Sequence, residues 1–133
     1  MSKRILVIDD EEATRMSFTL ALEDTGFKVD TAESGEKGLQ MKRDAEYDLI
    51  FLDLKMPGIN GVQTLREIRK TDKEVPVYIV TAFHKEFFEK LKIARKEGLD
   101  FEVLKKPIGN EEIVLLTKSI LGGVQEIKET IHV

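Results

Sequence analysis

The chain has 133 residues, enough for a single domain with one core and too few for two full domains. It contains no cysteine, which excludes a disulfide framework and a thiolate zinc site and fits a reducing cytosol. The net charge of −4 argues against non-specific binding to nucleic acid, and no apolar stretch approaches the length that spans a bilayer. We therefore expect one cytoplasmic domain with no direct contact to nucleic acid or membrane.

Five short apolar runs alternate with five segments of helical spacing. The runs are Ile5–Ile8, Phe27–Val29, Leu49–Leu52, Val77–Val80 and Phe101–Leu104. The helical segments carry Ala13, Met16 and Leu20; Leu39 and Met41; Val62, Leu65 and Ile68; Phe87, Leu91 and Ala94; and Ile113, Leu116 and Ile120. Ser34 is placed to cap the second helix and Asn110 the fifth. Apolar strands separated by helices predict an α/β fold, a doubly wound five-stranded parallel sheet with five helices.

Polar side chains stand where four of these strands end. Asp9 and Asp10 follow the first run, Asp53 the third, Thr81 the fourth and Lys106 the fifth. The carboxyl ends of neighbouring strands converge in such a sheet, so these side chains are expected in one pocket. Clustered carboxylates repel one another and call for a cation, and Mg²⁺ prefers carboxylate and phosphate oxygens. Between a metal and a lysine, a carboxylate is suited to attack phosphorus.

Four motifs in this order resemble the receiver domain of two-component response regulators. They are Ile8-Asp9-Asp10-Glu11, the stretch from Leu52 to Gly61, Val80-Thr81-Ala82, and Lys106-Pro107. The resemblance runs from about Lys3 to Leu121. It implies a receiver domain over residues 1–121 and a tail, 122–133, that is helical or begins a linker. The implied fold is flavodoxin-like, with strand order 2-1-3-4-5.

The resemblance also implies roles for the pocket residues. Asp53 would be the phosphoacceptor, Thr81 the switch hydroxyl and Lys106 the phosphate-binding lysine, with a cis bond before Pro107. The implied cofactor is Mg²⁺. Its ligands would be Asp10 and Asp53 directly, Asp9 through water, and the backbone carbonyl of Lys55.

The function that follows from the resemblance is a phosphorylation-activated signalling switch and not an enzyme with a separate substrate. A sensor histidine kinase or histidine phosphotransfer protein would donate the phosphoryl group to Asp53, and the domain would catalyse only its own phosphotransfer and dephosphorylation. Phosphorylation would then change the surface of the fourth helix, fifth strand and fifth helix. That surface would address a downstream partner or output domain, and a phosphorylation-dependent dimer is left open.

Two features depart from the family pattern. Receivers usually carry a tyrosine or phenylalanine three residues before the lysine, and this chain has Val103 there. The segment leading to Pro107 also looks one residue longer than usual, so Lys105 competes with Lys106 for the lysine's role. Adjacency to Pro107 favours Lys106.

The missing aromatic leaves two routes for the switch. Either Phe101 moves, or the loop after Thr81 carries the change with Phe83 and His84, and the loop is the favoured route. Phe83 and Lys55 are also expected to flank the entrance to the acyl phosphate.

Two other functions are weighed against the switch. A phosphohydrolase of the haloacid-dehalogenase type would need a second acid two residues after the nucleophile, and position 55 is lysine. A receiver-like binding module that has lost phosphorylation stays open, and a test for magnesium-dependent phosphorylation distinguishes it.

Overall fold

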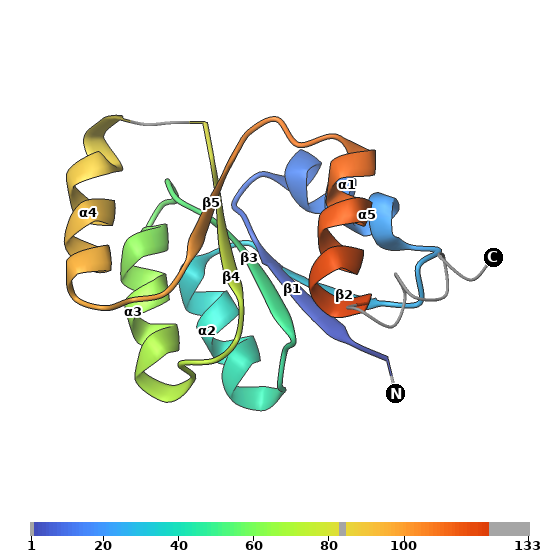
Figure 1. Cartoon of the computed structure of the whole chain (residues 1–133), viewed down its shortest axis with the longest axis horizontal. Helices are drawn as coiled ribbons and strands as arrows, with labels where there is room; N and C mark the ends of the chain where they lie inside the picture. The colour runs from blue at the N-terminus through green and yellow to red at the C-terminus, as the bar shows by residue number, and fades with distance from the viewer. Residues whose placement is uncertain (1, 83–84, 123–133) are drawn as a thin grey trace.

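The computed structural model describes residues 2–82 and 85–122. They form a parallel five-stranded sheet in the order β2-β1-β3-β4-β5, with helices on both faces (Figure 1). The predicted fold class and strand order are therefore confirmed. The strands are β1 (Arg4–Ile8), β2 (Lys28–Ala32), β3 (Leu49–Asp53), β4 (Val77–Thr81) and β5 (Glu102–Lys105). The helices are α1 (Glu12–Leu22), α2 (Gly35–Asp44), α3 (Gly61–Thr71), α4 (Phe88–Lys96) and α5 (Asn110–Thr117), with short turns η1 (Lys85–Phe87) and η2 (Lys118–Gly122).

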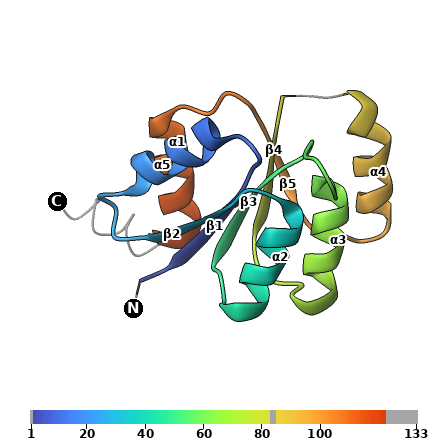
Figure 2. The same ribbon diagram turned by 180° about the vertical axis from the view of Figure 1, so that it is seen from behind.

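The sheet separates two hydrophobic clusters, because successive side chains along a strand point to opposite faces. On β3, Ile50 and Leu52 face the cluster under α2, α3 and α4, whereas Leu49 and Phe51 face the one under α1 and α5. Figures 1 and 2 show these two helical layers from opposite sides. All of β3 is buried, as expected for a central strand covered on both faces.

The rotation of α1 differs from the sequence expectation. Ala13, Met16 and Leu20 were expected to form its apolar stripe, but Met16 is 50% and Leu20 54% exposed. The face that packs on the sheet carries Phe18 and Leu22 instead. The ring centroid of Phe18 lies 4.7 Å from that of Phe51, a contact that buries a larger apolar surface than Met16 would. This helix has apolar residues on both faces, so spacing could not select the buried one.

Helix starts follow local capping chemistry in two cases and differ by one residue in a third. The Ser34 side chain accepts from the Lys37 amide at the start of α2, as predicted. Before α3, Asn60 and Gln63 bond reciprocally as a capping box. Asn110 was expected to cap α5 but is its first residue. The preceding position is Gly109, whose amide donates to the Glu112 carboxylate.

Strand register determines which side chains share the functional edge. Ile8 pairs with Leu52, Asp53 with Val80, and Thr81 with Lys105. β1, β3, β4 and β5 therefore end side by side, and the residues that follow them emerge together. No helix in the described part of the chain is long and apolar enough to cross a membrane. Of the predicted tail, 122–133, only Gly122 is among the described residues.

Candidate functional site

A group of acidic side chains lies at the carboxyl edge of the sheet. Carboxylate oxygens of Asp9, Asp10 and Asp53 all lie within 4.8 Å of one another. Asp9 and Asp53 are buried, whereas Asp10 is exposed. They adjoin a cavity of about 590 Å³, which is lined by Asp10, Glu11, Asp53, Lys55, Met56, Pro57, Ala82 and Lys106. The structure therefore brings the three sequence-predicted acids together beside an accessible space.

Lys106 reaches into this acidic group from the end of β5. Its Nζ lies 3.0 Å from Asp9 Oδ2, 3.2 Å from Asp53 Oδ1 and 3.4 Å from Glu11 Oε1. Lys105 is instead the ladder partner of Thr81 and is exposed. Lys105 occupies the last position of β5. The following residue, Lys106, is therefore the first whose side chain can extend past the end of the strand toward the acids. Of the two candidate lysines, Lys106 is the one in the pocket.

The main chain helps to hold these groups in place. The Glu11 amide donates to Asp9 Oδ1 at 2.9 Å, and the Leu54 amide donates to Asp53 Oδ1 at 3.0 Å. The Lys106 amide donates to the Thr81 carbonyl at 2.8 Å, and the peptide bond from Lys106 to Pro107 is cis, as expected. These hydrogen bonds orient the Asp9 and Asp53 carboxylates and hold the main chain of Lys106 against the end of β4.

Close approach of the backbone at Gly61 completes the loop beneath Asp53. The Gly61 amide donates to the Leu54 carbonyl at 2.8 Å. A Cβ at position 61 would collide with the Asp53 carbonyl oxygen and would lie 2.8 Å from the Leu54 Cα. Glycine is therefore required where α3 begins against the end of β3.

Electrostatics in the pocket favour an additional cation. Burial, reinforced by the charge of Asp9 and opposed by Lys106, raises the pKa of Asp53 to about 7. Burial also raises the pKa of Asp9. Burial alone would lower the pKa of Lys106, but its hydrogen bond to Asp9 and the charge of Asp53 outweigh it and raise this pKa to about 12. One ammonium therefore does not fully compensate the buried carboxylates.

The donor set fits Mg²⁺. The acids provide oxygen atoms, which are the ligands that hard divalent cations prefer, and the cavity leaves room for water and phosphate oxygens. In the predicted roles, Asp10 and Asp53 would hold the ion directly and Asp9 through water, together with the carbonyl of Lys55.

The hydroxyl and the rim residues occupy the remaining sides of the site. Thr81 ends β4 and is 2% exposed. Lys55 lines the cavity, and its Nζ forms an ion pair with Glu86 Oε1 at 3.2 Å. Phe83, which was expected at the entrance, and His84, expected with it in the switch loop, lie outside the described residues. Sequence reasoning missed Glu86, because an isolated acid in a charged segment carries no local signal; Glu11 was quoted only as part of a motif.

Phe101 and Val103 lie on the same side of the sheet. Both belong to the cluster under α3 and α4, and Phe101 is 2% exposed. The Arg95 guanidinium lies 4.2 Å from the centre of the Phe101 ring. An aromatic is thus buried beside β5 two residues before the position where the family pattern places one.

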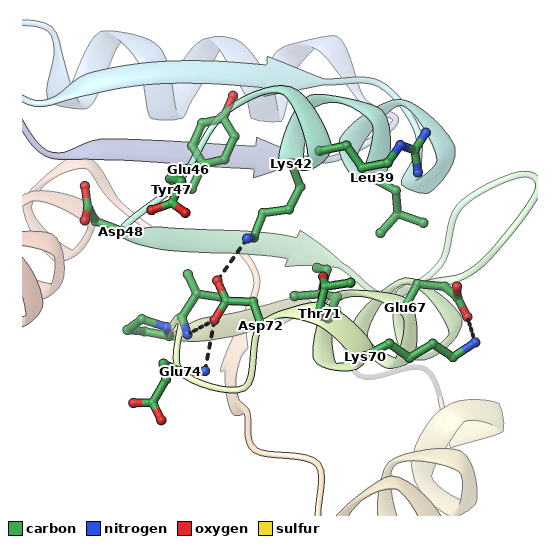
Figure 3. A pocket seen from close by; sticks show the side chains of 14 residues that line it. Leu39, Lys42, Glu46, Tyr47, Asp48, Glu67, Lys70, Thr71, Asp72 and Glu74 are labelled. Atoms are coloured by element: carbon green, nitrogen blue, oxygen red, sulfur yellow. Dashed lines mark hydrogen bonds and ion pairs between the residues drawn. The ribbon is translucent and has the colours of Figure 1, made fainter.

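A larger cavity, of about 1060 Å³, lies at the opposite edge of the sheet between the ends of α2 and α3 (Figure 3). Its charged groups largely satisfy one another. Lys42 pairs with Asp72 at 2.9 Å, and Lys70 pairs with Glu67 at 2.7 Å. Asp72 also accepts from the amides of Glu74 and Val75. Among the described residues, the group of three carboxylates that could hold a metal ion lies at the acidic edge and not in this cavity, so we place the chemistry at the acidic edge.

Comparisons with known proteins agree with this geometry. The response regulator receiver domain family matches residues 5–118. A transcriptional regulatory protein of Haemophilus influenzae, a CpxR homologue, is 42% identical over 91% of this chain and 51% of its own length. The transcriptional regulatory protein ResD of Bacillus subtilis is 35% identical over 89% of this chain and 48% of its own length. The chain therefore spans about half the length of these curated relatives.

Solved structures share the fold of this chain. A CheY-like receiver domain from Methanospirillum hungatei superposes with a TM-score of 0.81 at 26% identity, covering 97% of this chain and 99% of that one. The response regulator TrrA of Thermotoga maritima, in complex with Mg²⁺ and BeF, superposes with a TM-score of 0.74 at 34% identity, covering 90% of this chain and 99% of that one. With most of its length matched by the family and by relatives above 30% identity, this chain belongs to the response regulator receiver domains.

Proposed function

We propose that the domain is a signalling switch activated by transfer of a phosphoryl group to Asp53. The observation that carries this proposal is the position of the Asp53 carboxylate, between two other acids and the Lys106 ammonium beside an open cavity. A carboxylate in this position is suited to act as a nucleophile, because a cation held by the acids and the Lys106 ammonium would both stabilise phosphoryl transfer.

The side chains divide the chemistry between them. Leu54 and Lys106 both donate to Asp53 Oδ1, so we assign the attack on phosphorus to Oδ2. The new Oδ2–P bond forms as the bond from phosphorus to the donor's imidazole nitrogen breaks, and that nitrogen keeps the electron pair. Mg²⁺, held by the acids when bound, would neutralise part of the charge on the phosphoryl oxygens. Lys106 provides a second positive charge, and the Thr81 hydroxyl is suited to donate to a phosphoryl oxygen.

Ionisation of Asp53 is a precondition for this reaction. With its pKa near 7 in the absence of metal, a substantial fraction of Asp53 is protonated at neutral pH and cannot act as a nucleophile. A cation beside the carboxylate favours the charged form. Magnesium dependence of phosphorylation therefore follows from the burial of Asp53 and its proximity to Asp9.

The output of the switch is proposed to be the surface formed by α4, β5 and α5. Thr81 pairs with the last residue of β5. A movement of the Thr81 hydroxyl toward the phosphoryl group would therefore displace the end of that strand. Phe101, buried against Arg95 of α4, is one element that could respond; the loop containing Phe83 is the other. The donor would be a sensor histidine kinase or phosphotransfer protein, and the recipient an output domain or separate partner.

The haloacid-dehalogenase alternative has little support at the site. It needs an acid two residues after the nucleophile, but Lys55 stands there, and its ammonium pairs with Glu86. A receiver-like binding module that has lost phosphorylation would not incorporate phosphate from a small donor in the presence of Mg²⁺.

The test uses a small acyl-phosphate donor with Mg²⁺ and measures the mass of the intact protein. We expect one added phosphoryl group, removed by hydroxylamine because an acyl phosphate is labile to this nucleophile. Asp53→Asn should abolish the addition. Asp24→Asn, at an exposed position after α1, is the matched control and should behave as the wild type. Equal incorporation in Asp53→Asn and wild type would refute the assignment, and no incorporation in the wild type would favour the binding module.

A further inference from the structure

The ion pair between Lys55 and Glu86 connects the rim of the phosphorylation pocket to the start of α4. Lys55 lies two residues after Asp53 and lines its cavity, and Glu86 lies in η1, the turn that leads directly into α4. Their charged atoms are 3.2 Å apart, and the side chains are 57% and 60% exposed. The next residue, Phe87, is 7% exposed and anchors this turn in the core.

The Lys55 ammonium has one anionic partner, Glu86, and lies on a cavity in which phosphorylation would create a second. On one side is the carboxylate of Glu86, outside the acidic group. On the other is the pocket, where a phosphoryl group on Asp53 would add about −1.5 to −2 charges. A lysine has a flexible four-carbon stem and can turn its ammonium from one partner to the other. Because the pair with Glu86 is exposed, it is weak enough to be broken by a strong new anion nearby.

We propose that Glu86 is a positioning residue that holds the Lys55 ammonium away from the pocket and releases it when a phosphoryl group arrives. Glu86 thereby weakens retention of the anion in the pocket, and the release frees the start of α4 from the loop that follows Asp53. This inference rests on the proposed function and adds a residue and a connection that the shared receiver site does not include.

Beryllofluoride is an anion that mimics a phosphoryl group on a carboxylate. Its Kd in the presence of Mg²⁺ measures how strongly the pocket retains such an anion. Glu86→Gln should lower the Kd for beryllofluoride about two- to fivefold, the range that an exposed ion pair can supply. Lys55→Met should raise the Kd by a similar factor, because the pocket loses an available cation. In the Lys55→Met background, Glu86→Gln should have no further effect, since Glu86 acts through Lys55.

Glu89→Gln is the matched control. Glu89 lies in the first turn of α4, and its exposed carboxylate pairs with Lys92 and not with Lys55. Glu89→Gln removes one negative charge three residues from Glu86. If the Kd for beryllofluoride is unchanged in Glu89→Gln, the effect of Glu86→Gln comes from the ion pair with Lys55 and not from a general loss of negative charge near the pocket. Amide exchange across residues 88–96 gives a second readout: the change caused by beryllofluoride should shrink in Lys55→Met.

The outcomes are separable. An unchanged Kd in Glu86→Gln, or an equal effect of this substitution with and without Lys55, overturns the inference while leaving phosphorylation of Asp53 intact. A wild-type protein that neither binds beryllofluoride nor accepts phosphate overturns the proposed function as well.

Discussion

Replacing Asp53 with asparagine should stabilise the metal-free protein, and increasingly so as the pH rises. The native state raises the pKa of Asp53 from 3.8 to about 7, chiefly by burial and then by the charge of Asp9. Between these two values the native state binds more protons at Asp53 than the unfolded state does. The free energy of unfolding therefore falls as the pH rises through this window. Asp9, whose pKa is also raised, contributes in the same direction.

The size of the effect follows from the same values. A rise of about three pH units, at about 1.36 kcal/mol each, sets an upper value of about 4 kcal/mol. Asp53 borders an open cavity, so water screens part of this cost, and we expect about 2 kcal/mol. Lys106 does not alter the trend. Its raised pKa means that it stays charged from pH 4 to 8, and its stabilising contribution is lost only as the pH rises toward about 12.

The assay is urea unfolding in the presence of a chelator, followed by circular dichroism at several values from pH 4 to 8. Asp53→Asn and wild type should be similar near pH 4 and should diverge by about 2 kcal/mol by pH 8. Asp24→Asn, an exposed control, should track the wild type throughout. Millimolar Mg²⁺ should raise the free energy of unfolding of the wild type at high pH, because Mg²⁺ binds the native state. A difference between Asp53→Asn and wild type that does not change with pH would refute the reasoning.

Three further substitutions test other parts of the structure. Asp10→Ala should remove the rise in melting temperature caused by Mg²⁺; an undiminished rise would exclude Asp10 from the metal site. Gly61→Ala should cost more than about 2 kcal/mol and slow phosphorylation, because its Cβ collides with the main chain of Asp53, whereas Gly109→Ala has room and should be nearly neutral in both assays. Arg69→Met should cost about 3 kcal/mol in urea unfolding, because this buried guanidinium donates to three backbone carbonyls that would lose their partner; a cost below about 1 kcal/mol would show that water replaces it.

Sequence patterning was sufficient for the fold and for most members of the site. The run Leu49–Leu52 is apolar throughout, and this pattern arises when helices cover both faces of a parallel sheet. An acid placed directly after such a strand has its position determined by the chain, because the end of a strand defines the edge of the sheet. For this reason the sequence alone predicts that Asp9, Asp10 and Asp53 lie together, as they do in the structure.

Tertiary structure decided what depends on rotation and register. The apolar face of α1 was predicted wrongly, because Met16 and Leu20 have the same spacing as a buried stripe and only contact with Phe51 selects Phe18. Lys105 and Lys106 are adjacent in sequence, and the pairing of Lys105 with Thr81 determines which ammonium enters the pocket. The Lys55–Glu86 pair joins residues 31 positions apart, one after β3 and the other in η1. Local sequence determines which side chains reach an edge, whereas packing between elements determines which of them meet, because non-local contacts depend on every element between them.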